Sequence, residues 1–334
     1  MSSKFKPHSV IFACFILVIL TSVLGICFGA VNLSASELID GILTGAKTPN
    51  GRIVLYSRLP RVLGTALAGS SLAVSGAIIQ SVLGNPLASP NIIGVNSGAG
   101  FFTVLCLALF PSAYKLLPAA AFLGAIISVM TVYLIARKTG ASKITLVLAG
   151  VAIASLFNAG INTVTTFFPD SLSGINAFKI GGVTGLTLDR LSPAWAFITI
   201  GIIAALLLNH ELDILSLGDK TAQSLGMNVR LIRFLLLMIS ALLAGAAVSF
   251  AGLIGFVGLI VPHISRHFVG NESRFLIPVC ALSGAAFVTL CDIISRTLFA
   301  PYEIALGIVI SYIGVPFFIG LLLKKRGGRH SDKN

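Results

Sequence analysis

The sequence is short of charged residues. Only 10 % of its 334 residues are Asp, Glu, Lys or Arg, whereas 56 % are apolar. This excludes an ordinary soluble protein, in which about 25 % of residues are charged. The mean hydropathy of +1.00 and several apolar runs of roughly twenty residues place the chain in a bilayer. The net charge of +12 would suggest nucleic acid in a soluble protein, but here it belongs to the loops between the runs, so we expect no nucleic-acid partner.

The sequence also lacks the motifs of catalysis and metal binding. It contains no G-x-x-x-x-G-K-[ST] loop, no Ser/His/Asp arrangement and no HExxH. Its cysteines have no CxxC spacing and fall in or beside apolar runs, which indicates small buried hydrophobes. We therefore expect no enzyme activity, no cofactor and no metal site, and any ATP that drives the protein must be hydrolysed by a separate chain. The five cysteines are Cys14, Cys27, Cys106, Cys280 and Cys291.

Apolar runs predict an all-α, polytopic membrane protein with about ten transmembrane helices in a single domain, 1–334. The first run is longer than the apolar region of a signal peptide, so we interpret it as a membrane span. The third and eighth spans are short or broken, because Pro90 precedes one and Pro262 lies inside the other. The expected spans are 10–31, 58–82, 92–110, 116–136, 144–167, 192–209, 231–253, 255–269, 275–298 and 303–323.

The second span is rich in Gly, Ala and Ser. Its small residues recur at helical spacing, as in Gly69, Ala73 and Gly76, which predicts a buried helix that other helices approach closely. Two parts of the chain align weakly with each other. The segment from Arg58 to Arg61 corresponds to 230–233, and Pro90 corresponds to Pro262. This alignment suggests an inverted repeat, a signature of transporters, although two Gly/Ala-rich helices also resemble each other by chance.

Most Lys and Arg residues lie in loops that are cytoplasmic if the N-terminus is inside. This bias and the even number of spans predict that both termini are cytoplasmic. Three arginines are exceptions, because the predicted topology places them on the outer side of the membrane. They are Arg58, Arg61 and Arg296. They either meet an acidic partner or extend to lipid headgroups.

Ionisable residues inside the spans are few, and each is a functional candidate. Asp292 precedes Arg296 by four residues, so we favour a structural ion pair for it. An ion-coupled secondary transporter, the alternative function, requires carboxylates that face one another across the bundle. The scarcity of such carboxylates disfavours that alternative.

The most polar internal stretch, 210–230, predicts two short amphipathic helices divided by Gly218. Leu212, Leu215, Ala222 and Leu225 are expected to share an apolar face, opposite a wet side that includes Asp219 and Lys220. This stretch contains only two positively charged residues, which is too few to bind anionic lipid well. Docking in a groove of a soluble partner is therefore the favoured interpretation.

Several motifs occur in one order along nearly the whole chain. They include R-L-P-R at 58–61, N-P-L-A-x-P-x-x-x-G at 85–94, L-G-D-K-T-A-Q-S-L-G at 217–226 and G-F-V-G-L-x-x-P-H-x-x-R at 255–266. In these motifs the chain resembles the permease family of bacterial ABC importers for iron–siderophores, haem and cobalamin. One departure is Gly84, where that family often has Arg.

The resemblance implies a permease in the bacterial inner membrane that imports such a ligand with the energy of ATP. The implied partners are a second copy of the chain or a close paralogue, two ATP-binding subunits and an extracytoplasmic substrate-binding protein. It also implies three groups of site residues. Arg58, Arg61 and Arg296 would meet the binding protein; Leu212, Leu215, Gly218, Asp219, Lys220, Ala222, Leu225 and Gly226 would couple to the ATPase; and Ser142, Thr145 and Asn158 would line the path or gate.

Overall fold

The computed structural model describes residues 6–29, 41, 45–111, 114–138, 143–169, 176 and 178–327, and within these ranges it contains helices and no strand. Each expected span coincides with one helix, so the all-α, polytopic fold class is confirmed. Among the described residues, seven helices are long and apolar enough to cross a membrane. The helices at the expected spans are α1 (Pro7–Cys27), α4 (Leu59–Leu83), α5 (Val95–Leu109), α6 (Leu117–Lys138), α7 (Lys143–Phe167), α9 (Leu188–Leu207), α12 (Val229–Ala251), α13 (Val257–Val269), α14 (Ser273–Thr297) and α15 (Leu306–Gly327).

Shorter helical segments join these helices. A five-residue helix α3 (Pro49–Ile53) and a π-helical turn η2 (Val54–Arg58) lead directly into α4. The 3-10 turn η3 (Pro90–Ile93) precedes α5, and α10 (Asn209–Ser216) and α11 (Asp219–Ser224) connect α9 to α12. Further 3-10 turns are η1 (Gly45–Lys47) and η4 (Tyr114–Leu116).

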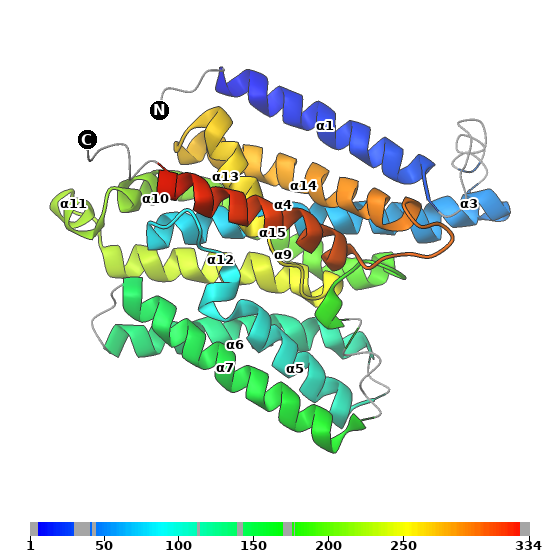
Figure 1. Cartoon of the computed structure of the whole chain (residues 1–334), viewed down its shortest axis with the longest axis horizontal. Coiled ribbons are helices and arrows are strands. Elements are labelled where there is room, and N and C mark those ends of the chain that lie inside the picture. Colours follow the sequence, from blue (N-terminus) through cyan, green and yellow to red (C-terminus); the bar gives the residue numbers. More distant parts are fainter. Residues whose placement is uncertain are drawn as a thin grey trace.

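Helix α4 is the centre of the bundle (Figure 1). Of the long candidate spans it has the highest buried share, 78 % of its apolar stretch, and it packs against α12, α13 and α14. A Cβ added at Gly69 would lie 2.0 Å from the carbonyl oxygen of Gly284, and one added at Gly76 would lie 1.9 Å from that of Gly258. The small residues of α4 therefore allow direct backbone contact, as its composition predicts.

Hydroxyl groups on α4 also bond to its neighbour α12. Ser71 Oγ donates to the Leu243 carbonyl at 2.5 Å and Ser75 Oγ donates to that of Ser240 at 2.8 Å. From Ser71 to Ser75 the residue number on α4 rises, whereas that of the bonded residue on α12 falls from 243 to 240. The two helices are therefore antiparallel. This is the relation that an inverted repeat requires.

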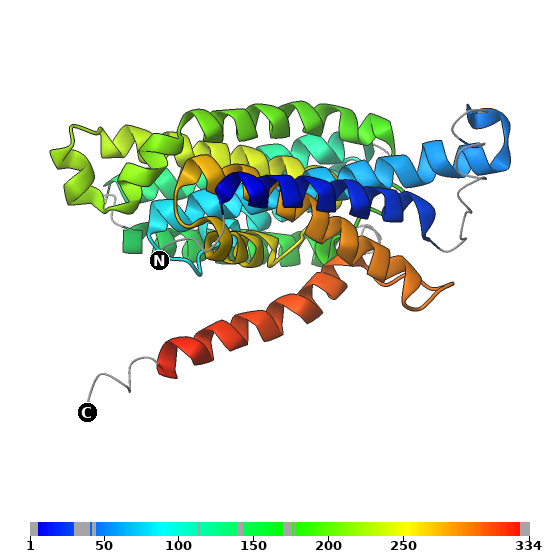
Figure 2. The same ribbon diagram turned by 90° about the horizontal axis from the view of Figure 1, so that it is seen from above.

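Helices α5, α6 and α7 form a second group that joins the first through contacts of α6 with α12 (Figure 1). Within it, a Cβ added at Gly98 would lie 2.4 Å from the Gly124 carbonyl oxygen, so α5 and α6 also touch backbone to backbone. On another side of the molecule, α15 leans away from the bundle (Figure 2). Its Tyr312, Val315 and Ile319 side chains are exposed.

The two ends of the bundle differ. Helix α1 begins and α15 ends at the end that carries α10 and α11, whereas α3 lies at the opposite end (Figure 1). We call these the α10–α11 end and the α3 end. Placing both terminal helices at one end fits an even number of crossings. The side of the membrane that each end faces stays a prediction.

Candidate functional site

The α10–α11 element, residues 209–226, is built into the bundle. Gly218, with φ +105°, separates the two helices as the sequence predicts. Leu212, Leu215 and Ala222 are buried, and α10 packs against α4 and α14. The element is therefore an extension of the helix core at this end of the molecule.

Two polar contacts fix the α10–α11 element to neighbouring helices. The Asp219 carboxylate accepts a hydrogen bond from Arg233 Nη2 of α12 at 2.6 Å, and that arginine is buried. Asp213 Oδ1 accepts from the Ser273 backbone N–H at 2.9 Å, which satisfies a free donor at the start of α14. Core packing and polar contacts therefore hold this element on three helices, α4, α12 and α14.

Two leucine side chains are exposed on the surface of the α10–α11 element. Leu217 and Leu225 are 63 % and 62 % exposed, and Lys220 and Gly226 are exposed beside them. The expectation that Leu225 shares one apolar face with Leu212, Leu215 and Ala222 is therefore wrong, and the face formed by those three residues packs into the bundle of this chain and is not open to a partner. Gly218 interrupts the helix, so the periodicity of α10 does not continue to Leu225, which follows the last residue of α11. Single exposed leucines are common on protein surfaces, so these two do not by themselves identify a contact with another protein.

An ionic cluster joins four segments at the α3 end. Arg61 of α4 donates to Asp292 Oδ1 of α14 at 2.9 Å and to both carboxylate oxygens of Glu303 at 3.0 Å. Arg296 lies 3.4 Å from Asp292 Oδ2, which agrees with the predicted structural pair. Arg61 is the closer partner, and sequence spacing gave no sign of it because the two residues lie on different helices.

The other contacts of the cluster reach the end of α1. Arg296 Nη2 donates to the Gly25 carbonyl at 2.7 Å, and Arg58 Nη1 donates to the carbonyls of Ile26 and of Cys27, the latter at 2.6 Å. Arg58, Arg61 and Arg296 are thus buried and bonded inside the chain, 4 %, 9 % and 3 % exposed. A role for them in docking gains no support from this geometry and stays a prediction.

Helix α7 carries the predicted path residues. Asn158 is exposed and Thr145 is half-buried, while Ser142 lies outside the described residues. Asn158 belongs to an exposed polar stripe that also contains Ser155, Asn162 and Thr166, all at helical spacing. Exposed amides are costly against hydrocarbon, so this stripe requires water or another protein chain. Sequence analysis found only Asn158, although the spacing of the other three was visible.

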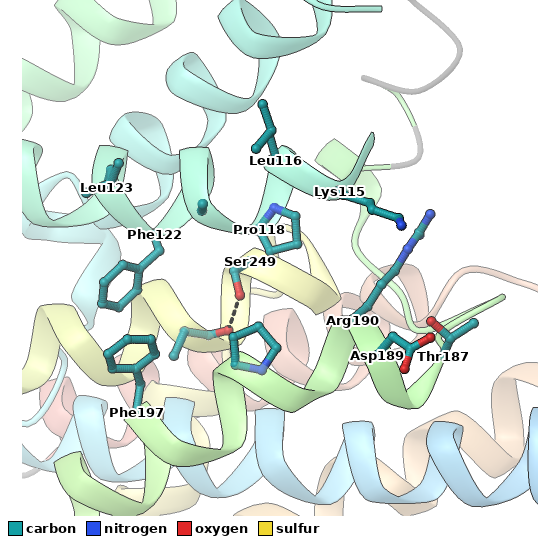
Figure 3. Close-up of a pocket in the computed structure, with 13 residues that line it drawn as sticks. Lys115, Leu116, Pro118, Phe122, Leu123, Thr187, Asp189, Arg190, Phe197 and Ser249 are labelled. Atoms are coloured by element: carbon teal, nitrogen blue, oxygen red, sulfur yellow. Dashed lines mark hydrogen bonds between the residues drawn. The ribbon is translucent and has the colours of Figure 1, made fainter. Parts of the chain in front are cut away.

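Grooves of the molecule lie between helices. One of about 980 Å³ lies between α6, α9 and α12, with the stacked rings of Phe122 and Phe197 in its wall, 4.8 Å between centroids. Figure 3 shows Lys115 and Arg190 pointing toward one another at its end, beside Asp189. A second groove, of about 610 Å³, runs along α15 and is lined by Ser311 and Tyr312. Within the described residues, no three His, Cys, Asp or Glu side chains gather as metal ligands.

The fold, with its long apolar helices, is that of a multi-pass membrane protein. The chain matches the FecCD transport family over residues 16–324 and belongs to that family, whose members are permease subunits of ABC transporters. The resemblance seen in the sequence motifs is thereby confirmed.

Relatives match over the full length of the chain. It is 35 % identical over 320 residues to the Fe(3+)-citrate import system permease protein YfmE of Bacillus subtilis, covering 95 % of each. It is 34 % identical over 335 residues to the hemin transport system permease protein HmuU of Yersinia pestis, covering 98 % of this chain and 99 % of that protein. A solved inward-facing structure assigned to the metal-chelate type of ABC transporter superposes with a TM-score of 0.85 at 29 % identity, covering 95 % and 99 % of the two chains.

The ionic cluster predicts a large loss of stability for Asp292→Ala. This change leaves Arg61 and Arg296 buried without their shared carboxylate, which costs about 3–5 kcal/mol. Glu272→Ala is the matched control, because it removes an exposed pair with Arg274 at 2.5 Å and should cost less than about 1 kcal/mol. Thermal unfolding in detergent measures both. Equal losses would show that the cluster does not hold the α3 end together.

Proposed function

We propose that the chain is the membrane subunit of an ATP-driven importer that carries an iron–siderophore complex, haem or cobalamin into the cytoplasm. Its relatives are named for Fe(3+)-citrate and hemin, which supports a chelated metal as the cargo. The observation that carries the proposal is the α10–α11 element. It is anchored to α4, α12 and α14 and presents Leu217 and Leu225 at its surface.

In this proposal the α10–α11 end faces the cytoplasm and two ATP-binding subunits dock there. Nucleotide binding would change the spacing of the docked subunits and displace the element. Because Asp219 is bonded to Arg233 and Leu215 is buried in the core, the displacement would pass to α12 and α4. Such coupling needs two states of the bundle that bind the nucleotide-loaded partner with different affinity.

An ion-coupled carrier is disfavoured by the contacts of the carboxylates within the spans. Asp292 and Glu303 both accept hydrogen bonds from Arg61. Each carboxylate is therefore already bonded to the buried Arg61 guanidinium, so neither has the open coordination that a transported cation needs. This supports an external source of energy.

A second copy of the chain, or a close paralogue, would cover α7 and α15. The exposed Asn158 and Asn162 of α7 would then face a water-filled path between the two subunits. The exposed face of α15 around Tyr312 would line or close the same space. Each subunit on its own would expose these amides to lipid, which supports assembly as a dimer.

Replacing both exposed leucines by Asp should uncouple transport from ATP hydrolysis. Leu217→Asp/Leu225→Asp adds charge where the partner surface must be apolar, and uptake should fall about tenfold or more, as for the loss of an interface hot spot. The measurement is ATP-dependent uptake of a ferric siderophore by liposomes that contain the chain with the ATP-binding subunit and binding protein of its own genome.

The control is Leu217→Met/Leu225→Met, which preserves apolar contact and should transport normally. Thermal unfolding of the purified chain should be unchanged in both variants, because the side chains are exposed. Uptake driven by an ion gradient in liposomes with this chain alone would overturn the proposed function. Full coupling in the Asp variant would reject the assigned role of the α10–α11 element.

Substituting the polar stripe tests the proposed path. Asn158→Leu/Asn162→Leu removes two amides from the water-filled space, and uptake should fall about tenfold while the midpoint of unfolding stays the same. Thr163→Val is the control, since its hydroxyl is bonded within the helix, donating to the Ala159 carbonyl at 2.9 Å, and the change leaves both amides in place. If the amides face lipid instead, the double variant should be more stable and transport should be unchanged.

Docking of the binding protein at the α3 end requires exposed cations. Lys47 of η1 and Arg52 of α3 are exposed there, a few residues before the buried Arg58 and Arg61. We extend the docking surface to these two residues, because complementary charge at the rim of an interface raises the association rate.

Lys47→Glu/Arg52→Glu should therefore slow association with the binding protein about tenfold at low salt, and high salt should reduce the difference between variant and wild type. Surface plasmon resonance on the chain in nanodiscs measures both rates. The exposed Lys138 and the half-buried Lys143 at the other end, both changed to Glu, are the charge control. Equal effects of the two pairs would reject a local docking site.

A further inference from the structure

A basic groove lies between α6 and α12 at the α10–α11 end. Its volume is about 430 Å³, and it is formed where α6 ends and α12 begins. Arg137 is the second-last residue of α6, and Arg230 is the second residue of α12. Both side chains are exposed and line the groove, at the depth where transmembrane helices reach the headgroups.

The charge of this groove is of one sign. Its lining contains two guanidinium groups and no carboxylate, and neither Arg137 nor Arg230 forms an ion pair with any described residue. The larger groove at the α3 end differs, because its lining includes the carboxylate of Asp189 as well as Lys115 and Arg190 (Figure 3). The small groove is therefore the more selective of the two for an anion.

The rest of the lining is suited to a lipid. The Tyr133 ring lies against Phe234 with 4.8 Å between centroids, and its hydroxyl donates to the Arg230 carbonyl at 3.5 Å. Leu134 and Leu231 are about half exposed on the two walls. An aromatic ring with a polar tip, placed between charged and apolar side chains, is typical of the boundary between headgroups and acyl chains.

We propose that this groove binds one anionic phospholipid of the phosphatidylglycerol class. Its phosphodiester lies between Arg137 and Arg230, and an acyl chain follows Leu134, Leu231 and Phe234. Basic pockets between transmembrane helices recognise anionic headgroups in this way, and planar guanidinium groups bond to phosphate through two donors. The lipid would bridge α6 to α12, and thus link the α5–α7 group to the helix that follows the α10–α11 element.

The test uses the full-length chain, stripped of lipid in a neutral detergent and titrated with dioleoylphosphatidylglycerol. Native mass spectrometry counts bound lipid, and the shift of the unfolding midpoint gives the affinity. Wild type should prefer this lipid to dioleoylphosphatidylcholine by about tenfold, since each arginine near an anionic headgroup contributes on the order of a tenfold change or less. Arg137→Gln/Arg230→Gln should abolish that preference.

Two further variants make the test specific. Lys138→Gln/Lys143→Gln removes the same charge at the same end from residues that do not line the groove, and should keep the preference. Leu134→Trp fills the apolar wall while retaining both arginines, and should displace the lipid. Unfolding midpoints without lipid, which should match wild type, verify that each variant is folded.

Four results would overturn the proposal. The first is equal affinity of wild type for the two lipids, and the second is an equal loss in the two double variants. The third is binding of glycerol phosphate as tight as that of the lipid, which would indicate a site for free phosphate compounds. The fourth is retained lipid binding by Arg137→Gln/Arg230→Gln together with lost binding of the ATP-binding subunit, which would make the groove a protein contact.

Discussion

Backbone contact between helices at glycine is the constraint on which the rest of this structure depends. In lipid there is no hydrophobic force to bring helices together, so packing and hydrogen bonds must do so. At Gly69 and Gly76 of α4 the neighbouring carbonyl oxygens of Gly284 and Gly258 occupy the space of a side chain. This proximity sets the positions of α13 and α14, and serine hydroxyls set that of α12.

Once α4 is fixed, the charged groups near its ends have defined neighbours. At the α3 end Arg61 meets Asp292 and Glu303, and at the other end Arg266 donates to Gln80 of α4. Each guanidinium is held where few water molecules reach it, so each needs a partner within the chain. These polar contacts tie α4 to α14 at one of its ends and to α13 at the other.

Helices α7 and α15, unlike α4, are only partly covered by the rest of the chain. Polar side chains on α7 and apolar side chains on α15 are exposed, and α15 leans away from the bundle (Figure 2). One subunit is stable around α4 but incomplete at this surface. This contrast between a well-packed α4 and exposed side chains on α7 and α15 is the reason for the dimer proposed above.

The order and type of the helices followed from the sequence alone, because a bilayer requires long apolar runs and because Gly and Pro mark their ends. Gly218 was recognisable as a break for the same reason, and the role of Gly69 and Gly76 in packing was visible from their spacing. These features depend on neighbours along the chain. The family, too, was evident from motifs that keep their order.

The tertiary structure decided which polar groups meet. The pair of Arg61 and Asp292 joins residues on two helices, and no local pattern specifies which helices are adjacent. It also decided that Arg58, Arg61 and Arg296 are buried and that Leu225 is exposed. Burial depends on what packs against a residue from distant parts of the chain, and hydropathy along the sequence does not contain that information.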